Sequence, residues 1–235
     1  MVQLVKNLML ATNRIVLWDI DGTLGFTPKA SEPSPHVEII KKMFGNKIKS
    51  VQNNHGMTDL QLVFEILKHN RIQFSSDITD QLIKDLDLYC LQNPREFLPI
   101  SNSIDVCRLL HEFEVIQGVQ TGNTISRAKE KIQKLGLSGM FHPALNFYGG
   151  LTLAKALIEI NSTLESFENH EVVIVGDSSA DVNLAAKNGF KCLILTSKYD
   201  QKSKIGRDLP KEKFATQAID DFRIEDVLDL FNWGR

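Results

Sequence analysis

The sequence of 235 residues has few cysteines, and their arrangement excludes two classes of protein. The number of cysteines is odd, and the three are widely spaced: Cys90, Cys107 and Cys192. No C-x-x-C pair occurs. This pattern argues against a disulfide framework and against a zinc site. We therefore expect a reducing, cytoplasmic setting, with the cysteines acting as small buried hydrophobic side chains.

Long apolar runs are also missing, so no segment is predicted to cross a membrane. The first residues, 2–11, are mildly apolar, but Lys6 interrupts them and Asn13 and Arg14 follow at once. A signal peptide would carry its basic residues before the apolar stretch. We interpret this part of the chain as a packed N-terminal segment.

No charge of one sign predominates, since 27 basic residues stand against 29 acidic ones, for a formal net charge of −2. A general nucleic-acid or membrane-surface binder would usually carry a basic excess. The balance does not argue against a small anionic substrate, because a site can be locally positive inside a neutral protein. The 43% of hydrophobic residues is typical of a soluble globular protein.

Short apolar runs alternate with helical patterns along most of the chain. Four runs have the composition of buried strands: 14–20, 115–120, 172–175 and 192–195. Four segments between or beside them show helical spacing: 103–113, 126–135, 152–160 and 180–188. This alternation predicts an α/β fold with a doubly wound, mostly parallel sheet.

Residues 25–97 differ from this pattern, because no strand is expected there. Thr58 and Gln61 form a capping box that opens a helix, and the apolar residues from Ile78 to Tyr89 form a second helical stripe. We predict a core domain of residues 1–24 and 98–235, interrupted by a helical cap domain of residues 25–97. Residues 25–35 and 93–99 are expected to be the linkers between the two.

Polar residues follow three of the predicted strands at the point where each strand ends. They are Asp19-Ile20-Asp21-Gly22-Thr23, Thr121-Gly122-Asn123, and the segment Gly176–Asp181, which reads Gly-Asp-Ser-Ser-Ala-Asp. Parallel strands bring these ends to one edge of the sheet, where sites form in open α/β folds. Each group alone has an ordinary alternative as a turn, a helix N-cap or a first-turn acid. Their joint order favours a site for phosphate and a hard metal ion.

These motifs resemble those of the haloacid dehalogenase superfamily of aspartate-nucleophile hydrolases. Asp19 to Leu24 is similar to the first motif, Thr121 to the second, and Asp177 with Asp181 to the fourth. The resemblance covers nearly the whole chain. Within the superfamily, Thr121-Gly122-Asn123 and the cap residues 56–59 look like those of the phosphoglycolate-phosphatase-like branch with a helical cap.

The resemblance implies a role for each acidic residue. Asp19 would be the covalent nucleophile, and Asp21 would protonate the leaving oxygen and later deprotonate the attacking water. Mg²⁺ would be held by Asp19, by Asp177 and by the carbonyl oxygen of Asp21. Asp181 would be a direct ligand or would orient a metal-bound water, and the sequence leaves both open.

The same resemblance implies how the phosphoryl group is held. The Thr121 hydroxyl and the backbone N–H groups of Gly122 and Asn123 would bind its oxygens near the start of the next helix. The family's third motif is a lysine that commonly stands before a proline, a context that this sequence lacks. Lys155 is the best candidate for that catalytic and phosphate-binding lysine, and Lys129 is a weaker substitute.

The function predicted from the sequence is a Mg²⁺-dependent hydrolase of a small phosphorylated metabolite, such as a phosphosugar, phosphoglycolate or a nucleotide monophosphate. We expect the cap to close over the site, and neither nucleic acid nor membrane is an expected partner. A phosphotransferase such as a sugar phosphomutase would use the same residues. An acylphosphate switch resembling a receiver domain ranks low, because such domains lack the second aspartate and the cap. A catalytically silent relative is a further alternative, and the substrate and the choice between monomer and homodimer stay open.

Overall fold

The computed structural model describes residues 14–28, 34–49, 57–149, 171–195, 216–219 and 222. Chain elements in these ranges are β1 (Arg14–Trp18), β2 (Gly25–Phe26), α2 (Pro35–Phe44), α3 (Asp59–His69), α4 (Ser76–Gln92), β3 (Leu98–Pro99), α5 (Ser103–Glu112), β4 (Ile116–Thr121), α6 (Ile125–Lys134), η1 (Pro143–Leu145), β5 (Asn146–Tyr148), β6 (Glu171–Gly176), α8 (Ser179–Asn188), β7 (Lys191–Leu195) and β8 (Thr216–Ile219).

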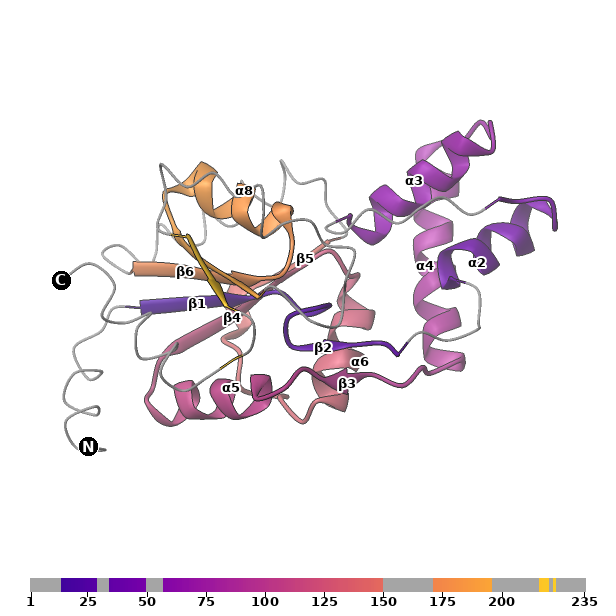
Figure 1. Ribbon diagram of the computed structural model, residues 1–235. Coiled ribbons are helices and arrows are strands. Elements are labelled where there is room, and N and C mark those ends of the chain that lie inside the picture. The colour runs from indigo at the N-terminus through magenta and orange to yellow at the C-terminus, as the bar shows by residue number, and fades with distance from the viewer. Residues whose placement is uncertain are drawn as a thin grey trace.

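Six strands form one sheet in the order β5-β4-β1-β6-β7-β8, and all neighbouring pairs run parallel. Helix α8 covers one face, and α5 and α6 cover the other (Figure 1). The predicted doubly wound α/β fold is therefore confirmed. The edge strands β5 and β8 were not predicted, because they have three and four residues and are too short to show a strand period.

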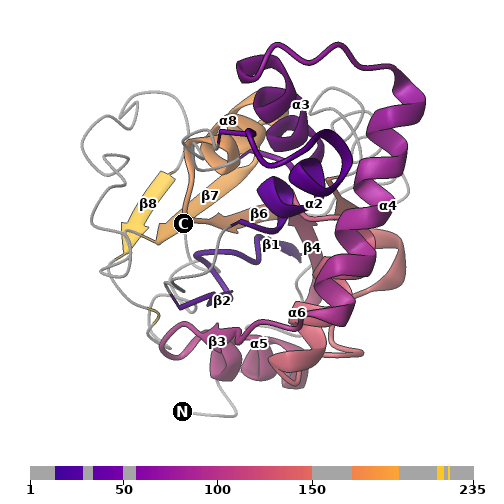
Figure 2. The ribbon, with the colours of Figure 1, turned by 90° about the vertical axis from the view of Figure 1, so that its right-hand side faces the viewer.

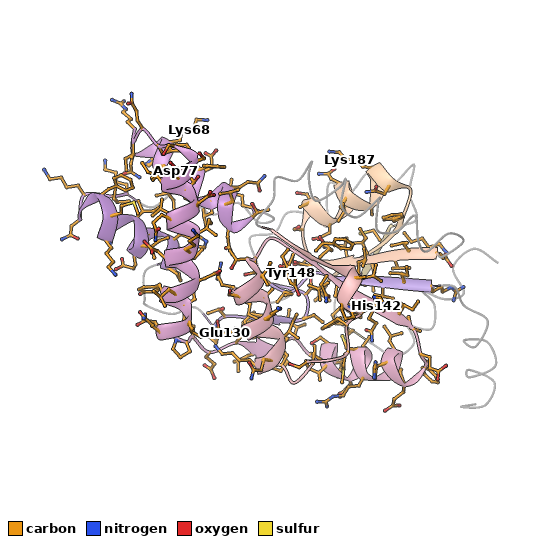
Figure 3. All side chains as sticks on the ribbon, turned by 180° about the vertical axis from the view of Figure 1, so that it is seen from behind. Lys68, Asp77, Glu130, His142, Tyr148 and Lys187 are labelled. Atoms are coloured by element: carbon orange, nitrogen blue, oxygen red, sulfur yellow. The ribbon has the colours of Figure 1, made fainter. Side chains whose placement is uncertain are left out.

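The cap helices α2, α3 and α4 form a separate unit beside the sheet. They share an apolar core that includes Ile40, Val63 and Leu82. The unit stands on the side of the sheet at which the carboxyl ends of β1, β4 and β6 lie (Figures 1 and 2). Lys68 and Asp77 lie in its part farthest from the sheet (Figure 3). The domain bounds given above stay a prediction.

The expectation that residues 25–97 contain no strand is wrong at one point. Gly25–Phe26 pairs antiparallel with Leu98–Pro99, so the outgoing and returning segments form a two-stranded ribbon at the base of the cap helices. The period of a two-residue strand cannot be recognised in a sequence. The predicted linker 25–35 also ends in a helix start, because Pro35 occupies the first position of α2, where proline is tolerated.

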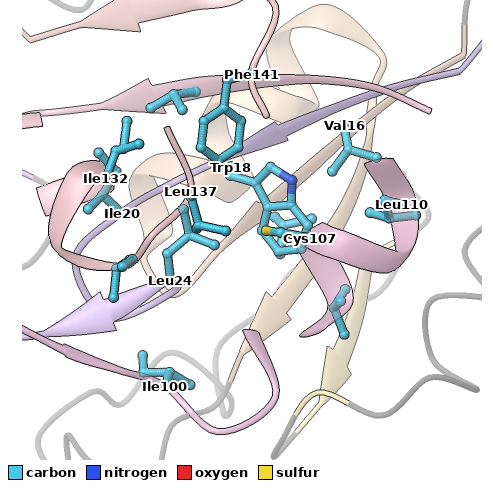
Figure 4. Close-up of a cluster of buried hydrophobic side chains, with 14 of the residues drawn as sticks. Val16, Trp18, Ile20, Leu24, Ile100, Cys107, Leu110, Ile132, Leu137 and Phe141 are labelled. Carbon is cyan, nitrogen blue, oxygen red and sulfur yellow. The ribbon is translucent and has the colours of Figure 1, made fainter. Parts of the chain in front are cut away.

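Alternation along β1 divides the core into two layers. Val16 and Trp18 pack against α5 and α6, whereas Ile15 and Leu17 pack on the α8 side, as the period of two in a strand requires. Figure 4 shows Trp18 surrounded by apolar side chains, and its Nε1 donates to Gln117 Oε1 at 3.0 Å. This buried strand holds the segment that follows it, which carries Asp19.

Within the described ranges, no helix is both long enough and apolar enough to span a bilayer.

Candidate active site

The turn after β1 is tied to its neighbours by backbone hydrogen bonds. The Asp19 N–H donates to the Val175 carbonyl oxygen of β6 at 2.8 Å, and the Gly25 N–H donates to the Ile20 carbonyl oxygen at 3.0 Å. Gly22 has φ of 86° in this turn, a conformation that residues with a Cβ rarely adopt. The backbone around Asp19 is therefore set by the sheet and by a glycine-dependent turn.

Three carboxylates meet where β1 and β6 end. Asp19, Asp177 and Asp181 each offer an oxygen, and these atoms all lie within 4.8 Å of one another. Asp177 also packs closely on the first turn, since a Cβ placed on Gly22 would lie 1.9 Å from its Oδ2. Carboxylate oxygens at this spacing suit a hard divalent cation such as Mg²⁺. The structure thus brings together three of the four predicted metal-site residues.

Electrostatic repulsion within this cluster also favours a cation. Burial raises the pKa of Asp19 well above its ordinary value, and the charges of Asp181 and Asp177 raise it further. Burial also raises the pKa of Asp181, although hydrogen bonds from Ser178 and Gln120 oppose the shift. A divalent cation among these groups would replace repulsion by attraction and keep the carboxylates ionised.

Asp181 is held by donors on both sides of its carboxylate. The Ser178 N–H and hydroxyl donate to Oδ2 at 2.9 and 2.6 Å, and the Gln120 amide donates to Oδ1. Gly176 leaves room for this side chain, because a Cβ there would lie 2.4 Å from Asp181 Oδ2. Gln120 was not predicted to belong to the site, since a glutamine on a strand gives no local signal of which distant carboxylate it contacts.

The loop after β4 is joined to the first turn through a buried asparagine. Asn123 Nδ2 donates to Asp21 Oδ2 at 2.6 Å and to Thr121 Oγ1 at 2.8 Å. The N-cap position of α6 belongs to Thr124. Thr121 is therefore not the helix cap, and its hydroxyl lies in the network that also contains Asp21.

Asp21 faces α6 through an ion pair that the sequence analysis did not foresee. Lys131 Nζ donates to Asp21 Oδ1 and Oδ2 at 2.7 and 2.6 Å, and to Asn123 Oδ1 at 2.8 Å. Asp21 lies beyond β1, which ends at Trp18, in the turn that contains Gly22.

The charge of Lys131 determines the ionisation of Asp21. Desolvation by neighbouring groups works to raise the pKa of Asp21, but the Lys131 ammonium and the hydrogen bond from Asn123 outweigh it and lower the pKa below its ordinary value. The Asp21 carboxylate is therefore ionised at neutral pH before any substrate arrives. It is in the form that accepts a proton.

The predicted third-motif lysine, Lys155, lies outside the described residues. The substitute Lys129 is exposed on α6, whereas Lys131 reaches the site. A signal for Lys131 existed: Arg127, Lys131 and Lys134 follow one another at helical spacing directly after the Thr121 loop. Spacing alone did not indicate that this basic face turns toward Asp21.

A second buried polar cluster joins the cap helices to α6, the helix that follows the Thr121–Asn123 loop. Asp59, at the start of α3, accepts from His36 Nε2 of α2 at 2.9 Å and forms an ion pair with Arg127 of α6. Desolvation works to raise the pKa of Asp59, but Arg127 outweighs it and holds the pKa well below its ordinary value. Because an ionised carboxylate only accepts hydrogen bonds, His36 must carry its proton on Nε2.

His36 should make the protein less stable in mild acid. Burial lowers the pKa of His36, and Asp59 compensates only in part. The unfolded chain, with a histidine pKa of about 6.5, takes up a proton that the folded chain does not, so the free energy of unfolding falls as pH drops below that value. Urea denaturation at pH 7, 6 and 5 should show this fall, and His36→Gln should reduce it. The exposed His69→Gln is the matched control, and an unchanged pH slope in His36→Gln would contradict the prediction.

The sequence matches the haloacid dehalogenase-like hydrolase family over residues 16–195. The chain belongs to this family. The match spans the first strand, the cap helices and the loops that carry all three motifs, which confirms the family expected from the sequence. No protein of curated function matches the chain.

Several solved structures are similar to this chain in fold. A β-phosphoglucomutase from Clostridium difficile has a TM-score of 0.65 at 12% identity, with 94% of this chain and 97% of that one covered. A protein described as a predicted phosphoglycolate phosphatase from Haemophilus somnus has a TM-score of 0.62 at 16% identity, with 93% and 97% covered. CbbY from Rhodobacter sphaeroides, solved in complex with phosphate, has a TM-score of 0.60 at 13% identity, with 88% and 94% covered. At these identities the likeness shows the fold.

Proposed function

We propose that this haloacid dehalogenase-like protein is a Mg²⁺-dependent phosphatase that acts on a small phosphorylated metabolite through an aspartyl phosphate. The observation that carries the proposal is the meeting of Asp19, Asp177 and Asp181 within 4.8 Å at the carboxyl ends of two parallel strands. The Thr121–Asn123 loop supports it, since it is joined to this edge by the Asn123–Asp21 hydrogen bond.

In the first half of the reaction, an Asp19 carboxylate oxygen attacks phosphorus in line with the ester oxygen. The new bond joins Asp19 to phosphorus, and the phosphorus–ester oxygen bond breaks. Asp21 gives a proton to the departing oxygen, which leaves as an alcohol. The Thr121 hydroxyl and the N–H groups of its loop hold the phosphoryl oxygens during this step.

Asp21 has to gain a proton before it can act as the acid. Lys131 keeps it ionised when no substrate is present. A phosphate group placed beside Asp21 opposes a second negative charge, so substrate binding shifts this carboxyl toward its protonated form. The pairing with Lys131 and the arrival of the substrate thus act on Asp21 in opposite directions.

In the second half, water attacks the phosphorus of the aspartyl phosphate. Asp21 takes a proton from that water, orthophosphate leaves, and the Asp19 carboxylate is restored. Mg²⁺, when bound, reduces the repulsion between the substrate and the carboxylates. Asp19, Asp177 and Asp181 would hold it, with the Asp21 carbonyl oxygen as a further ligand.

The cap helices favour a small substrate, because they stand beside the strand ends that carry the site (Figure 2). A phosphosugar, phosphoglycolate or a nucleotide monophosphate would each fit this class. A phosphomutase is the alternative, supported by the similarity in fold to a β-phosphoglucomutase. In that case a second hydroxyl of the sugar, and not water, would receive the phosphoryl group.

Orthophosphate release from a panel of phosphomonoesters, measured with Mg²⁺ and with EDTA, tests the proposal. We expect release with Mg²⁺ and a loss of about a hundredfold or more in EDTA, because the cation offsets the repulsion at the reacting phosphate. Added Mg²⁺ should restore it. Isomerisation of a sugar phosphate without net release would indicate the phosphomutase. A folded protein that acts on no panel member would contradict both functions.

A further inference from the structure

The cap helices contact the Thr121–Asn123 loop, the proposed phosphoryl-binding loop, through the backbone of Asp59. The Asp59 N–H donates to the Gly122 carbonyl oxygen at 2.8 Å. As the first residue of α3, Asp59 has no partner for this N–H inside its own helix. The contact is close, since a Cβ placed on Gly122 would lie 2.9 Å from the Met57 carbonyl oxygen. Gly122 therefore permits the cap segment to rest on the loop.

This bond sets the direction of one peptide group in the loop. In a trans peptide the N–H points away from the C=O. The Gly122 carbonyl turned toward the cap thus leaves the Asn123 N–H on the opposite side, where it donates to Thr121 Oγ1 at 3.3 Å. This Thr121 hydroxyl is the group that we propose to bind a phosphoryl oxygen. The cap contact consequently fixes one of the donors of the proposed phosphate site.

The Asp59 side chain holds the next peptide group. Its Oδ2 accepts the Thr124 N–H at 2.8 Å, while its Oδ1 is engaged by Arg127 and His36. Asp59 and Thr124 are both buried. The carboxylate lies between the N-terminal ends of α3 and α6, whose partial positive charges it neutralises.

The same loop has a second tether on its other side. The Gly149 N–H donates to the Asn123 carbonyl oxygen at 2.8 Å, and the Thr124 hydroxyl bonds to Asp87 of α4. Two successive carbonyls of the loop are therefore fixed, that of Gly122 by the Asp59 N–H and that of Asn123 by the Gly149 N–H. Asp59 and Asp87 both belong to the cap helices, and among the described residues of these helices only Asp59 hydrogen-bonds to the loop backbone, at the Gly122 carbonyl and the Thr124 N–H.

We propose that Asp59 is a positioning residue that couples the cap helices to phosphoryl binding by holding the Gly122–Thr124 backbone in its anion-binding orientation. The inference rests on the proposed function of that loop. It differs from a specificity role, because Asp59 acts on the loop and not on the substrate. When the cap helices rest on the core, the loop is ordered, and when they move away it loses both contacts.

Asp59→Asn tests the coupling with almost no change in side-chain shape. We expect the KM for the best phosphomonoester and the inhibition constant of orthophosphate to rise together by about tenfold or more, because partners that orient a binding group have effects of this size. The activation constant for Mg²⁺ should stay unchanged, since the hydrogen bonds described for the Asp59 carboxylate go to His36, Thr124 and Arg127. Asp77→Asn, an exposed first-turn acid on α4, is the matched control (Figure 3).

Circular dichroism and thermal unfolding establish that each variant is folded. A merely structural role for Asp59 would reduce the active fraction, and so kcat, without changing the orthophosphate constant of the folded molecules. Hydrogen exchange gives a second readout: in Asp59→Ala the amides of residues 122–124 should exchange faster than in the wild type. A folded Asp59→Asn whose orthophosphate constant stays within about twofold of the wild type would overturn the inference. A parallel rise in the Mg²⁺ constant would overturn it too.

Failure of the proposed function is separable from failure of this inference. If the wild type releases no orthophosphate from any ester, calorimetric titration with orthophosphate in the presence of Mg²⁺ replaces the kinetic constants. Weaker orthophosphate binding by Asp59→Asn would then still support the coupling, whereas equal binding would overturn it. A wild type that binds no orthophosphate would remove both proposals.

Discussion

Asp19→Asn should lower the kcat for orthophosphate release by at least about 10³-fold, because removal of a covalent nucleophile has effects of this order or larger. An amide oxygen is neutral and attacks phosphorus poorly, yet it can still contact a cation. The variant should therefore bind Mg²⁺ and still be inactive. Initial rates with the best substrate, over a range of Mg²⁺ concentrations, measure this directly.

Asp177→Asn is the matched comparison, because Asp177 belongs to the same cluster without being the proposed nucleophile. Its loss of activity should be recovered in part at high Mg²⁺, whereas that of Asp19→Asn should not.

The stability of Asp19→Asn gives an independent check. Since burial and neighbouring carboxylates raise the pKa of Asp19, its ionised form destabilises the metal-free fold near pH 7. Asp19→Asn should accordingly unfold at a higher temperature than the wild type in EDTA. High residual phosphatase activity in Asp19→Asn would rule out Asp19 as the nucleophile.

Asp21→Asn should reduce kcat by about 10²- to 10⁴-fold for alkyl phosphates, the range expected when a general acid or base is lost. An alkoxide is a poor leaving group and needs a proton as the phosphorus–oxygen bond breaks. Nitrophenolate needs little protonation, so the loss in the first step should be smaller with p-nitrophenyl phosphate. Burst and steady-state kinetics on the two substrates separate the step that forms the aspartyl phosphate from the step that hydrolyses it.

Lys131 provides a control for the position of Asp21. Lys131→Met leaves the carboxyl group in place but removes the cation that contacts both of its oxygens, so we expect a smaller loss with the same dependence on the leaving group. Lys134, one turn further along α6, pairs with Glu130, so Lys134→Met should have little effect on kcat. Equal losses on alkyl and aryl phosphates in the burst step of Asp21→Asn would argue against proton transfer from Asp21 to the leaving group.

Much of the fold was predictable because it depends on local patterns. The buried strand that precedes Asp19 and the helix that begins at the Thr58 capping box both appear where periodicity placed them. The two edge strands and the β2–β3 ribbon were not predictable, because their short segments become strands only through the neighbours they pair with. Helix α2 was not located individually, since its proline-rich approach reads as a linker.

The sequence by itself determined the family, the α/β order of the chain and the polar residues at three strand ends, because these depend on residue type and on spacing along the chain. Only the tertiary structure decided that Asp21 turns to Lys131 and that Asp59 joins His36, Arg127 and the Thr121 loop. Lys131 is 110 positions from Asp21, and Arg127 is 68 positions from Asp59. Such contacts form only when packed layers bring remote side chains together, and no local period records which pairs will meet.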